Sequence, residues 1–264
     1  MSAVRIEPVD GLPEITPGDD LAALILEVTA ARLEPGTVVC VAQKLVSKAE
    51  GRIVDLRTVE PSPAVALLAE ASGRDPRLDQ VILGESAEVI RGERGVLICR
   101  THHGFVCANA GVDRSNAGPD GSERAILLPV DPDGSARSLR AALQDRSGVA
   151  PLAVLISDSF GRAWRIGQVD VAIGVAGLTP TLPVDRSSRD RDGRALVASE
   201  PAIADELAAA ADLARTKAGG QGVVLVHGLG AHVGLADGPG AAATLRARHE
   251  DLFGARNAET PPEH

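Results

Sequence analysis

The stretch "VLICRTHHGFVCANAGVDRSN", residues 96–116, contains two apolar runs that predict β-strands near 96–100 and 105–108. Only "THHG" joins them, so these strands follow one another without a helix. Other predicted strands are separated by helices. A chain in which strands occur both as adjacent pairs and across helices favours an α+β fold with mixed or antiparallel sheets over a regular doubly wound sheet.

Apolar periodicity and capping residues predict the remaining elements. Asp19 or Asp20 begins a helix that a Pro-Gly pair ends, Ser62 and Asp75 each precede a proline at a helix start, and Ser135 caps a further helix. We expect helices over about 20–34, 63–72, 76–85, 135–147 and 200–217, strands over 37–43, 152–157 and 223–227, a partner strand for the first of these over 51–56, and an apolar stretch over 169–178.

Composition excludes several classes of function. The 264 residues are 44% hydrophobic and carry a formal net charge of -9, which is typical of a soluble globular protein and unfavourable for binding a nucleic-acid backbone. We expect one domain over residues 1–250, as a single unit or as two intertwined subdomains, and a tail over 251–264. No apolar segment suggests a signal peptide or membrane anchor, and Cys40, Cys99 and Cys107 lack metal-site spacing. These features predict a cytoplasmic protein.

Two groups of polar residues follow predicted strands. Asn109, Asp113 and Asn116 form either a surface turn or a ligand site, because Asn and Asp serve both purposes. Asp158 and Ser159 follow a buried strand and have the hard oxygen atoms that Mg²⁺ and Mn²⁺ prefer. The alternative is that Asp158 caps a helix and pairs with a nearby arginine.

Two further segments could contact phosphate groups. Lys44 and Lys48 come directly after a predicted strand, although a solvated turn would explain them equally well. The glycines of "TKAGGQG", residues 216–222, would let backbone N–H groups approach an anion or would simply end a helix. His102 and His103 are interpreted as loop residues. Neither a G-x-G-x-x-G nor a P-loop motif is present.

Several of these stretches, taken in order, resemble the coenzyme F420-0:L-glutamate ligases, also called F420 gamma-glutamyl ligases. The resemblance extends from "GLPEI" at 11–15 to the strand at 223–227. It implies an unusual α+β fold that forms a homodimer with its active site in a cleft. The motifs that carry it are "VAQKLVSKAEGR", "HGFVCANAGVDRSN", "LLPVDPDGSA", "ISDSFGRAWRIGQVDVAIGVAGL", "DGRAL" and "AIADELAAAADL".

The resemblance implies a ligase that adds L-glutamate to coenzyme F420-0 through gamma-linkages. GTP would phosphorylate the acceptor carboxylate, and the glutamate amine would then displace phosphate from the acyl phosphate. Mg²⁺ or Mn²⁺, together with K⁺, would assist, because charge moving between anionic substrates must be neutralised.

The same resemblance assigns roles to individual positions. The divalent metal would lie at Asp113, Asp158 and Ser159, and no further catalytic residue is identified. The family tends to have Gln or Glu where this chain has Lys217, and Arg-Gly where it has His227-Gly228. Residues implied to contact GTP are Leu12, Pro13, Glu14, Ile15, Gln43, Lys44, Lys48, Asn116, Lys217, Ala218, Gly219, Gly220 and Gln221.

Two other hypotheses remain open from the sequence. A metal-dependent nucleotide phosphohydrolase could use the same two carboxylates to activate water, and its GTP turnover would ignore glutamate and acceptor. A non-catalytic GTP-binding regulator would bind the nucleotide without releasing phosphate.

Overall fold

A mixed five-stranded sheet forms the centre of the molecule in the computed structural model, which describes residues 3–117, 123–182, 189, 191–194, 200–215 and 220–251. The strands lie in the order β1-β10-β2-β8-β9, and β2 and β8 are the parallel pair among antiparallel neighbours. Their bounds are β1 Arg5–Val9, β2 Val38–Ala42, β8 Ala153–Arg162, β9 Arg165–Ala176 and β10 Val223–His227.

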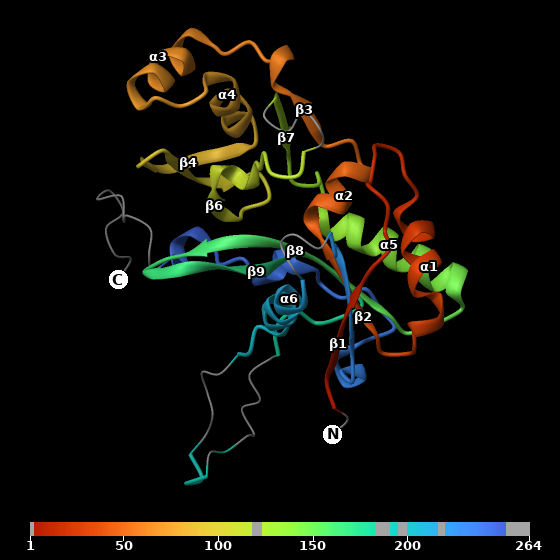
Figure 1. The fold of residues 1–264 in the computed structure, drawn as a ribbon. Coiled ribbons are helices and arrows are strands. Elements are labelled where there is room, and N and C mark those ends of the chain that lie inside the picture. The colour runs from red at the N-terminus through yellow and green to blue at the C-terminus, as the bar shows by residue number, and fades with distance from the viewer. Residues whose placement is uncertain are drawn as a thin grey trace.

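Helices cover both faces of this sheet (Figure 1). Because side chains alternate along a strand, Val39 and Val41 of β2 pack towards α1 (Leu21–Thr29) and α5 (Pro132–Ser147), whereas Val38 and Cys40 pack towards α6 (Ile203–Ala214). The short helix α2 (Gln43–Ala49) follows β2 directly. No helix in the described part of the chain is long and apolar enough to cross a membrane.

A small lobe, residues 53–126, lies above the sheet in Figure 1 and has its own buried cluster around Leu56, Ile82 and Cys99. Within it β3 pairs with β7, and β4, β5 and β6 form an antiparallel three-stranded sheet. Its elements are β3 Ile53–Asp55, α3 Pro63–Ser72, α4 Pro76–Gly84, β4 Ser86–Glu93, β5 Val96–Thr101, β6 Val106–Ala108 and β7 Arg124–Ile126. Short 3-10 turns lie at Ala30–Arg32, Leu56–Thr58, Asn109–Gly111, Gly230–His232, Ala241–Thr244 and Arg248–Glu250.

Three connecting segments and the middle of β8 meet at one edge of the five-stranded sheet, which we call the site edge. β1 ends at Val9 beside Val223, where β10 begins, and Val223 pairs with Val41 near the end of β2. Ala42, the last residue of β2, pairs with Ser157 on β8. The segments that follow β1 and β2 and the segment that precedes β10 therefore lie side by side, and β8 runs past them.

Much of the sequence prediction is confirmed. The fold is α+β with mixed and antiparallel sheets, and α3, α4 and β10 lie where they were expected. Ser62 and Asp75 cap α3 and α4 by accepting hydrogen bonds from backbone N–H groups, and the three cysteines are free and buried.

Other predictions were wrong. The strand expected at 51–56 pairs with β7 and not with β2, because a short helix, α2, carries the chain away from the sheet. α5 begins at Pro132 with Asp131 as its cap, so Ser135 lies inside the helix. β8 does not end near Ser157 but continues to Arg162, paired with β9 in a long hairpin. β1, β4 and β7 were not predicted.

Candidate active site

Lys44 and Asp158 reach the site edge from two parallel strands. β2 ends at Ala42, so Lys44 lies in the first turn of α2, while Asp158 is the next residue of β8 after Ser157, the partner of Ala42. Since the carboxyl ends of parallel strands meet at one edge of a sheet, the two side chains come from neighbouring positions. The hypothesis that Asp158 caps a helix is wrong, because it lies within a strand.

Asp113 approaches the same place from the small lobe. Its backbone exchanges two hydrogen bonds with Ile126, of 3.0 and 2.8 Å. The turn before it has left-handed backbone at Gly111, with φ of +74°, and a Cβ there would lie 2.7 Å from Leu128. The carboxylate of Asp113 lies 2.6 Å from Nζ of Lys44 and also accepts bonds from Ser115. The turn thus aims Asp113 at α2.

The pKa values of Asp113 and Asp158 are shifted in opposite directions. Burial would raise the pKa of Asp113, but the hydrogen bonds and charge of Lys44 and the bonds from Ser115 outweigh it and lower the pKa. The pKa of Asp158 is raised to about 7, mainly by burial, and the negative charges of Asp170 and Asp113 contribute to this rise. The backbone N–H of Ser159 and the charge of Lys44 lower it, but by less. The charges of Asp170 and Asp113 thus disfavour the ionised form of Asp158, whereas Lys44 stabilises the ionised form of Asp113.

Ser159 faces a different group. Its hydroxyl donates a 2.6 Å hydrogen bond to Asp170, whose other carboxylate oxygen accepts from Ser157 and from Arg215, both at 2.8 Å. Because successive side chains of a strand point to opposite faces, Ser157 and Ser159 lie together and Asp158 points the other way. The sequence did not indicate that Arg215 meets Asp170, although the alternation in "SDS" could have suggested that the two serines share a face.

The segments implied to contact GTP adjoin α2. Nζ of Lys48, whose side chain is 8% exposed, contacts Glu14 at 2.5 Å, which ties residues 12–15 to this helix. Lys48 is therefore not part of a solvated turn. Gln221 bonds Asp10 at 2.8 Å, and a Cβ on Gly222 would overlap Leu45 of α2. Lys217, Ala218 and Gly219 lie outside the described residues, whereas Gly220 and Gln221 lie at this edge.

Not every implied residue faces open space. The side chain of Gln43 is buried and bonds Ser47 and the backbone oxygen of Leu127, so its contacts are structural. Ile15 is part of the hydrophobic core. Leu12 and Pro13 also belong to the implied set, and both follow β1 at the site edge. Leu12 is partly buried and Pro13 is exposed.

The two asparagines near Asp113 differ. Asn116 is exposed in a turn with φ of +57°, beside Ser115, which contacts Lys44. Asn109 instead accepts a 3.1 Å hydrogen bond from the backbone N–H of Leu97 and holds β5 to the turn. His102 and His103 lie in the turn between β5 and β6, and each contacts a backbone oxygen, as expected for loop residues.

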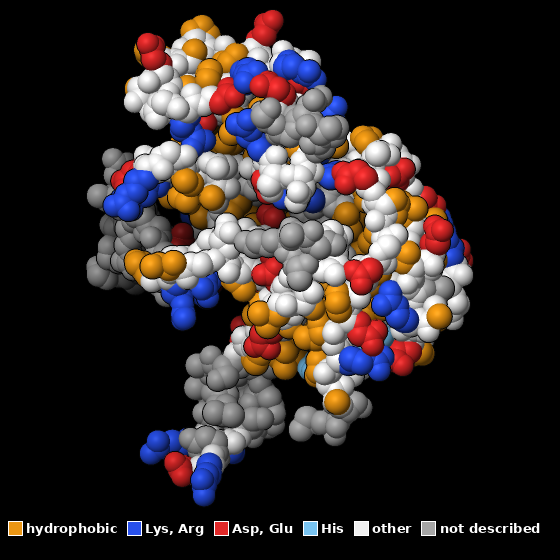
Figure 2. Space-filling model, viewed as in Figure 1, with side chains coloured by type: hydrophobic (Ala, Val, Ile, Leu, Met, Phe, Trp, Pro, Cys, Tyr) orange, Lys and Arg blue, Asp and Glu red, His pale blue; other side chains and the backbone are white. Residues whose placement is uncertain are grey.

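A hollow separates the small lobe from the β8–β9 hairpin (Figure 2). It includes a cavity of about 240 Å³ between β6 and the hairpin, where the rings of Phe105 and Phe160 meet edge to face at 6.2 Å. Phe160 lies two residues beyond Asp158 on β8, so this apolar space adjoins the carboxylates on the same strand face. Asp205 lines the far side of the cavity, and burial raises its pKa.

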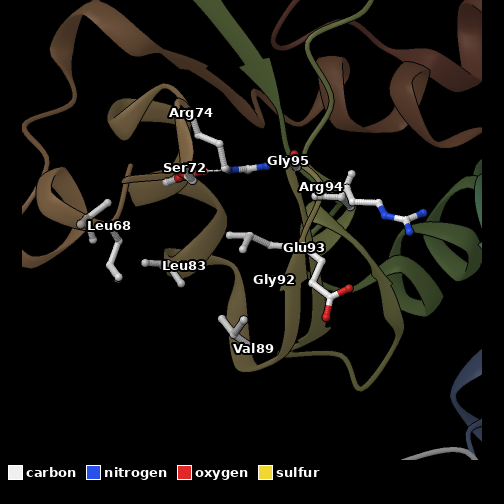
Figure 3. Close-up of a pocket in the computed structure, with 13 residues that line it drawn as sticks. Leu68, Ser72, Arg74, Leu83, Val89, Gly92, Glu93, Arg94 and Gly95 are labelled. Carbon is white, nitrogen blue, oxygen red and sulfur yellow. Dashed lines mark hydrogen bonds and ion pairs between the residues drawn. The ribbon is translucent and has the colours of Figure 1, made fainter. Parts of the chain in front are cut away.

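A second cavity, of about 570 Å³, lies in the small lobe and holds none of the predicted site residues (Figure 3). Its walls are mostly apolar, among them Leu68, Leu83 and Val89. Two of its polar side chains are already paired with each other, since Arg74 bonds Asp79, and Arg74 also bonds the backbone oxygen of Gly95. We therefore place the chemistry at the site edge and not in this cavity.

A divalent metal ion fits the pair of carboxylates at the site edge. Within the described residues no three Asp, Glu, His or Cys side chains are placed to hold a metal by themselves. Mg²⁺, however, is commonly held by one or two carboxylates while substrate phosphates and water complete its coordination. Asp113 and Asp158 repel each other, and an ion bound between them would relieve that repulsion.

The fold and the site together define an α+β protein whose charged groups gather between a small lobe and one edge of a mixed sheet. The sequence of residues 11–228 matches the model of the F420-0:gamma-glutamyl ligase family. The chain is 44% identical to the coenzyme F420:L-glutamate ligase of Methanothermobacter thermautotrophicus, over 93% of this chain and 96% of that protein.

Two more relatives carry the same name. The coenzyme F420:L-glutamate ligase of Methanopyrus kandleri is 44% identical over 96% of this chain and 98% of its own length, and that of Methanocaldococcus jannaschii is 38% identical over 84% and 86%. The chain belongs to the F420-0:gamma-glutamyl ligase family, and it is a ligase.

Proposed function

We propose that this enzyme adds L-glutamate to coenzyme F420-0 through gamma-linkages, with GTP as the phosphoryl donor and an acyl phosphate of the acceptor as intermediate. The observation that carries the proposal is the convergence of Asp113, Asp158 and Lys44 at one sheet edge, in a chain of this ligase family. A carboxylate is a poor electrophile, so it must be activated before an amine can attack it.

Charge neutralisation is the main requirement of such a reaction. GTP, glutamate and the acceptor are all anionic, and the phosphoryl group carries further charge in the transition state. Asp113 and Asp158 would hold Mg²⁺ or Mn²⁺, which supplies positive charge between the phosphates and the acceptor carboxylate. Ser159, the third residue of the implied set, would have to exchange its bond to Asp170 for the metal. K⁺ would add a monovalent charge.

The residues around α2 would bind and orient the nucleotide. Lys44 would keep Asp113 ionised and directed into the site, and Lys48 would contact a phosphate from its place beside Glu14. Residues 12–15, Asn116 and the loop from 217 to 221 would form the remaining wall. Because the implied active site lies in a cleft of a homodimer, we also propose that the enzyme is a dimer.

Mass spectrometry of a reaction with F420-0, GTP, Mn²⁺ and L-glutamate tests the proposal. We expect products heavier by one or more glutamate residues, together with GDP and phosphate. GTP turnover at the same rate without glutamate and acceptor would instead identify a phosphohydrolase. Binding of GTP with no turnover under any divalent metal would identify a non-catalytic nucleotide-binding protein.

A further inference from the structure

Arg215 is a buried arginine, and two of its three guanidinium nitrogens have no hydrogen-bond partner in the described part of the chain. It follows the last residue of α6, and its side chain is 9% exposed. Its Nη1 atom lies 2.8 Å from Asp170 and 2.8 Å from Ser157. Its Nε and Nη2 atoms are buried, and neither has a hydrogen-bond partner among the described residues.

A second buried arginine shows how this chain satisfies such a group when its purpose is structural. Arg140 of α5 has a side chain that is 6% exposed. Its Nε bonds the backbone oxygen of Leu152, its Nη1 bonds Asp237, and its Nη2 bonds two further backbone oxygens. Buried donors without a partner are uncommon, since leaving one unpaired is costly. Arg215 and Arg140 are therefore similarly buried, but of the two only Arg215 has guanidinium nitrogens without a hydrogen-bond partner from the residues that the structure describes.

The two unused atoms of Arg215 form one edge of the guanidinium group. In arginine, Nε–H and one N–H of Nη2 point the same way and match the spacing of two oxygens of a carboxylate or phosphate. Asp170 and Ser157 hold the opposite side, so the free edge is fixed in direction before any ligand arrives. Such orientation reduces the entropy lost on binding.

The cluster lies at the site edge. Ser159, which shares Asp170 with Arg215, is exposed and follows Asp158 directly along β8. The charges within the cluster cancel, because Asp170 carries one negative charge and Arg215 one positive charge. Since Nε and Nη2 are buried, only an oxyanion that enters the protein, and not one held at its surface, would supply the acceptor that the free edge lacks.

We propose that the Nε–Nη2 edge of Arg215 binds an oxyanion of a substrate, either a carboxylate or a phosphate group, during the ligase reaction. This inference rests on the proposed function for the identity of the substrates. Asp170 is a positioning residue in this arrangement, because it acts only through Arg215 and Ser159. The separate face of β8 on which Asp158 lies leaves that carboxylate for the metal ion.

The test uses Arg215→Lys, which keeps the charge and removes the two-donor edge, with Arg140→Lys as the matched control. KM is measured separately for GTP, L-glutamate and F420-0, and the Kd values of GDP and L-glutamate are measured by calorimetry. We expect Arg215→Lys to raise KM for one substrate by about tenfold or more and the others by less than about twofold, as for a lost charge-assisted bond. A change for GTP and GDP identifies a nucleotide phosphate, a change for glutamate identifies a carboxylate, and a change for F420-0 alone identifies an oxyanion of the acceptor.

Arg140→Lys should lower the melting temperature without changing any KM selectively. Unchanged KM values for Arg215→Lys, or equal changes for all three substrates, would overturn the proposal. If that variant does not fold, Arg215→Gln is measured in the same way, and failure of both to fold would make Arg215 purely structural. Should the wild-type enzyme add no glutamate to F420-0, the proposed function fails, yet the calorimetric comparison still tests Arg215.

Discussion

A buried arginine and a buried aspartate are fully hydrogen-bonded at one end of the five-stranded sheet, whereas a buried arginine at the other end is only partly hydrogen-bonded within the described residues. At the end where β2 and β8 begin, Arg140 uses all three guanidinium nitrogens, and Asp133 accepts bonds from the backbone N–H groups of Val175, Ala241 and Ala242. At the site edge, Asp158 has a pKa of about 7, and Arg215 has two unused donors. The difference indicates that the first end is built for stability and that the second keeps charge available for ligands.

The small lobe lies beside the site edge and supplies one of its charged groups. Its buried cluster is separate from those of the sheet, and it contributes Asp113 to the site edge. A carboxylate brought from another layer of the fold can approach Asp158 without being part of the same strand ladder. The four predictions below test, from the largest effect to the smallest, whether the site edge functions as this comparison suggests.

Asp113→Asn should cause the largest loss. The substitution keeps the size and turn preference of the side chain but removes a unit charge from the metal pair, so we expect a rate loss on the order of a hundredfold or more. Stability without metal should stay near that of wild type, because the Asp113–Lys44 ion pair is partly exposed. Steady-state kinetics over a range of Mn²⁺ concentrations, with thermal melts with and without Mn²⁺ plus GTP, measure both effects.

Asp75→Asn is the matched control for this prediction. Like Asp113, Asp75 is paired with a basic side chain, in its case Arg77, and accepts a backbone hydrogen bond, but it caps α4 in the small lobe. Since Asn is an equally good helix cap, this variant should keep the wild-type rate. Near-normal ligation by Asp113→Asn at saturating metal would show that Asp113 is only a turn residue.

Local chemistry made part of this structure predictable from sequence. Ser62 and Asp75 act within four residues of their own positions, and so the starts of α3 and α4 could be predicted. Asp113 and Asp158 were recognised as candidates because polar side chains that directly follow apolar strands are unusual. Asp170 and Arg215 are 45 residues apart, and no local pattern indicates that they meet.

Sheet pairing limited the prediction for the same reason. β3 was expected beside β2, its neighbour in sequence, but it pairs with β7, about 70 residues further along the chain. The register that brings Ala42 beside Ser157 is a property of the whole sheet. The residue types of the candidate site could therefore be predicted, and the alternation in "SDS" separates Asp158 from the two serines, whereas the pairing of those serines with Asp170 could not be predicted.

Lys48→Ala should have the next largest effect. If Lys48 contacts a phosphate, its loss removes a charge-assisted bond of about 1.5 to 3 kcal/mol, which raises KM for GTP by roughly tenfold or more. KM for glutamate should change much less. Glu14, which loses its partner, is 70% exposed and remains solvated, so the fold should survive.

Arg77→Ala serves as the control for Lys48→Ala, because Arg77 pairs with two carboxylates in the small lobe, away from the site edge. It should alter stability slightly and leave both KM values unchanged. Equal increases in KM for GTP and glutamate in Lys48→Ala would indicate general damage to the site and not a lost phosphate contact.

Asp158 should make the stability of the metal-free enzyme depend on pH. Its pKa is raised from 3.8 to about 7, mainly by burial, so the folded state retains a proton that the unfolded chain releases. Folded-state stability therefore falls as pH rises from about 4 to about 7. Relative to Asp158→Asn, we expect the wild-type enzyme to lose about 1 to 3 kcal/mol between about pH 5 and about pH 8, at ~1.4 kcal/mol per unit.

Denaturant unfolding at a series of pH values, with a chelator present, measures this difference. Asp205, whose pKa is also raised by burial, remains in both proteins, so its contribution cancels. Mn²⁺ with GTP should abolish the pH dependence by binding the ionised form. A difference between the two proteins that does not change with pH would mean that Asp158 is ionised throughout this pH range.

Ser159→Ala should have the smallest effect. It tests whether Ser159 only bonds Asp170 or also ligates the metal ion. The hydroxyl of Ser159 donates to Asp170 at 2.6 Å, and Asp170 keeps its bonds from Ser157 and Arg215 when that hydroxyl is removed. Ser159 is exposed, so water can replace the lost donor. A hydrogen bond to a carboxylate typically contributes about 1.5 to 3 kcal/mol, but water can replace most of this one, so we expect a rate loss of less than about tenfold with no change in the Mn²⁺ concentration required. A loss as large as that of Asp113→Asn, with a raised Mn²⁺ requirement, would mean that Ser159 leaves Asp170 to ligate the metal. Both faces of the strand would then serve one metal centre, and the division between the Asp158 face and the Asp170 face would have to be abandoned.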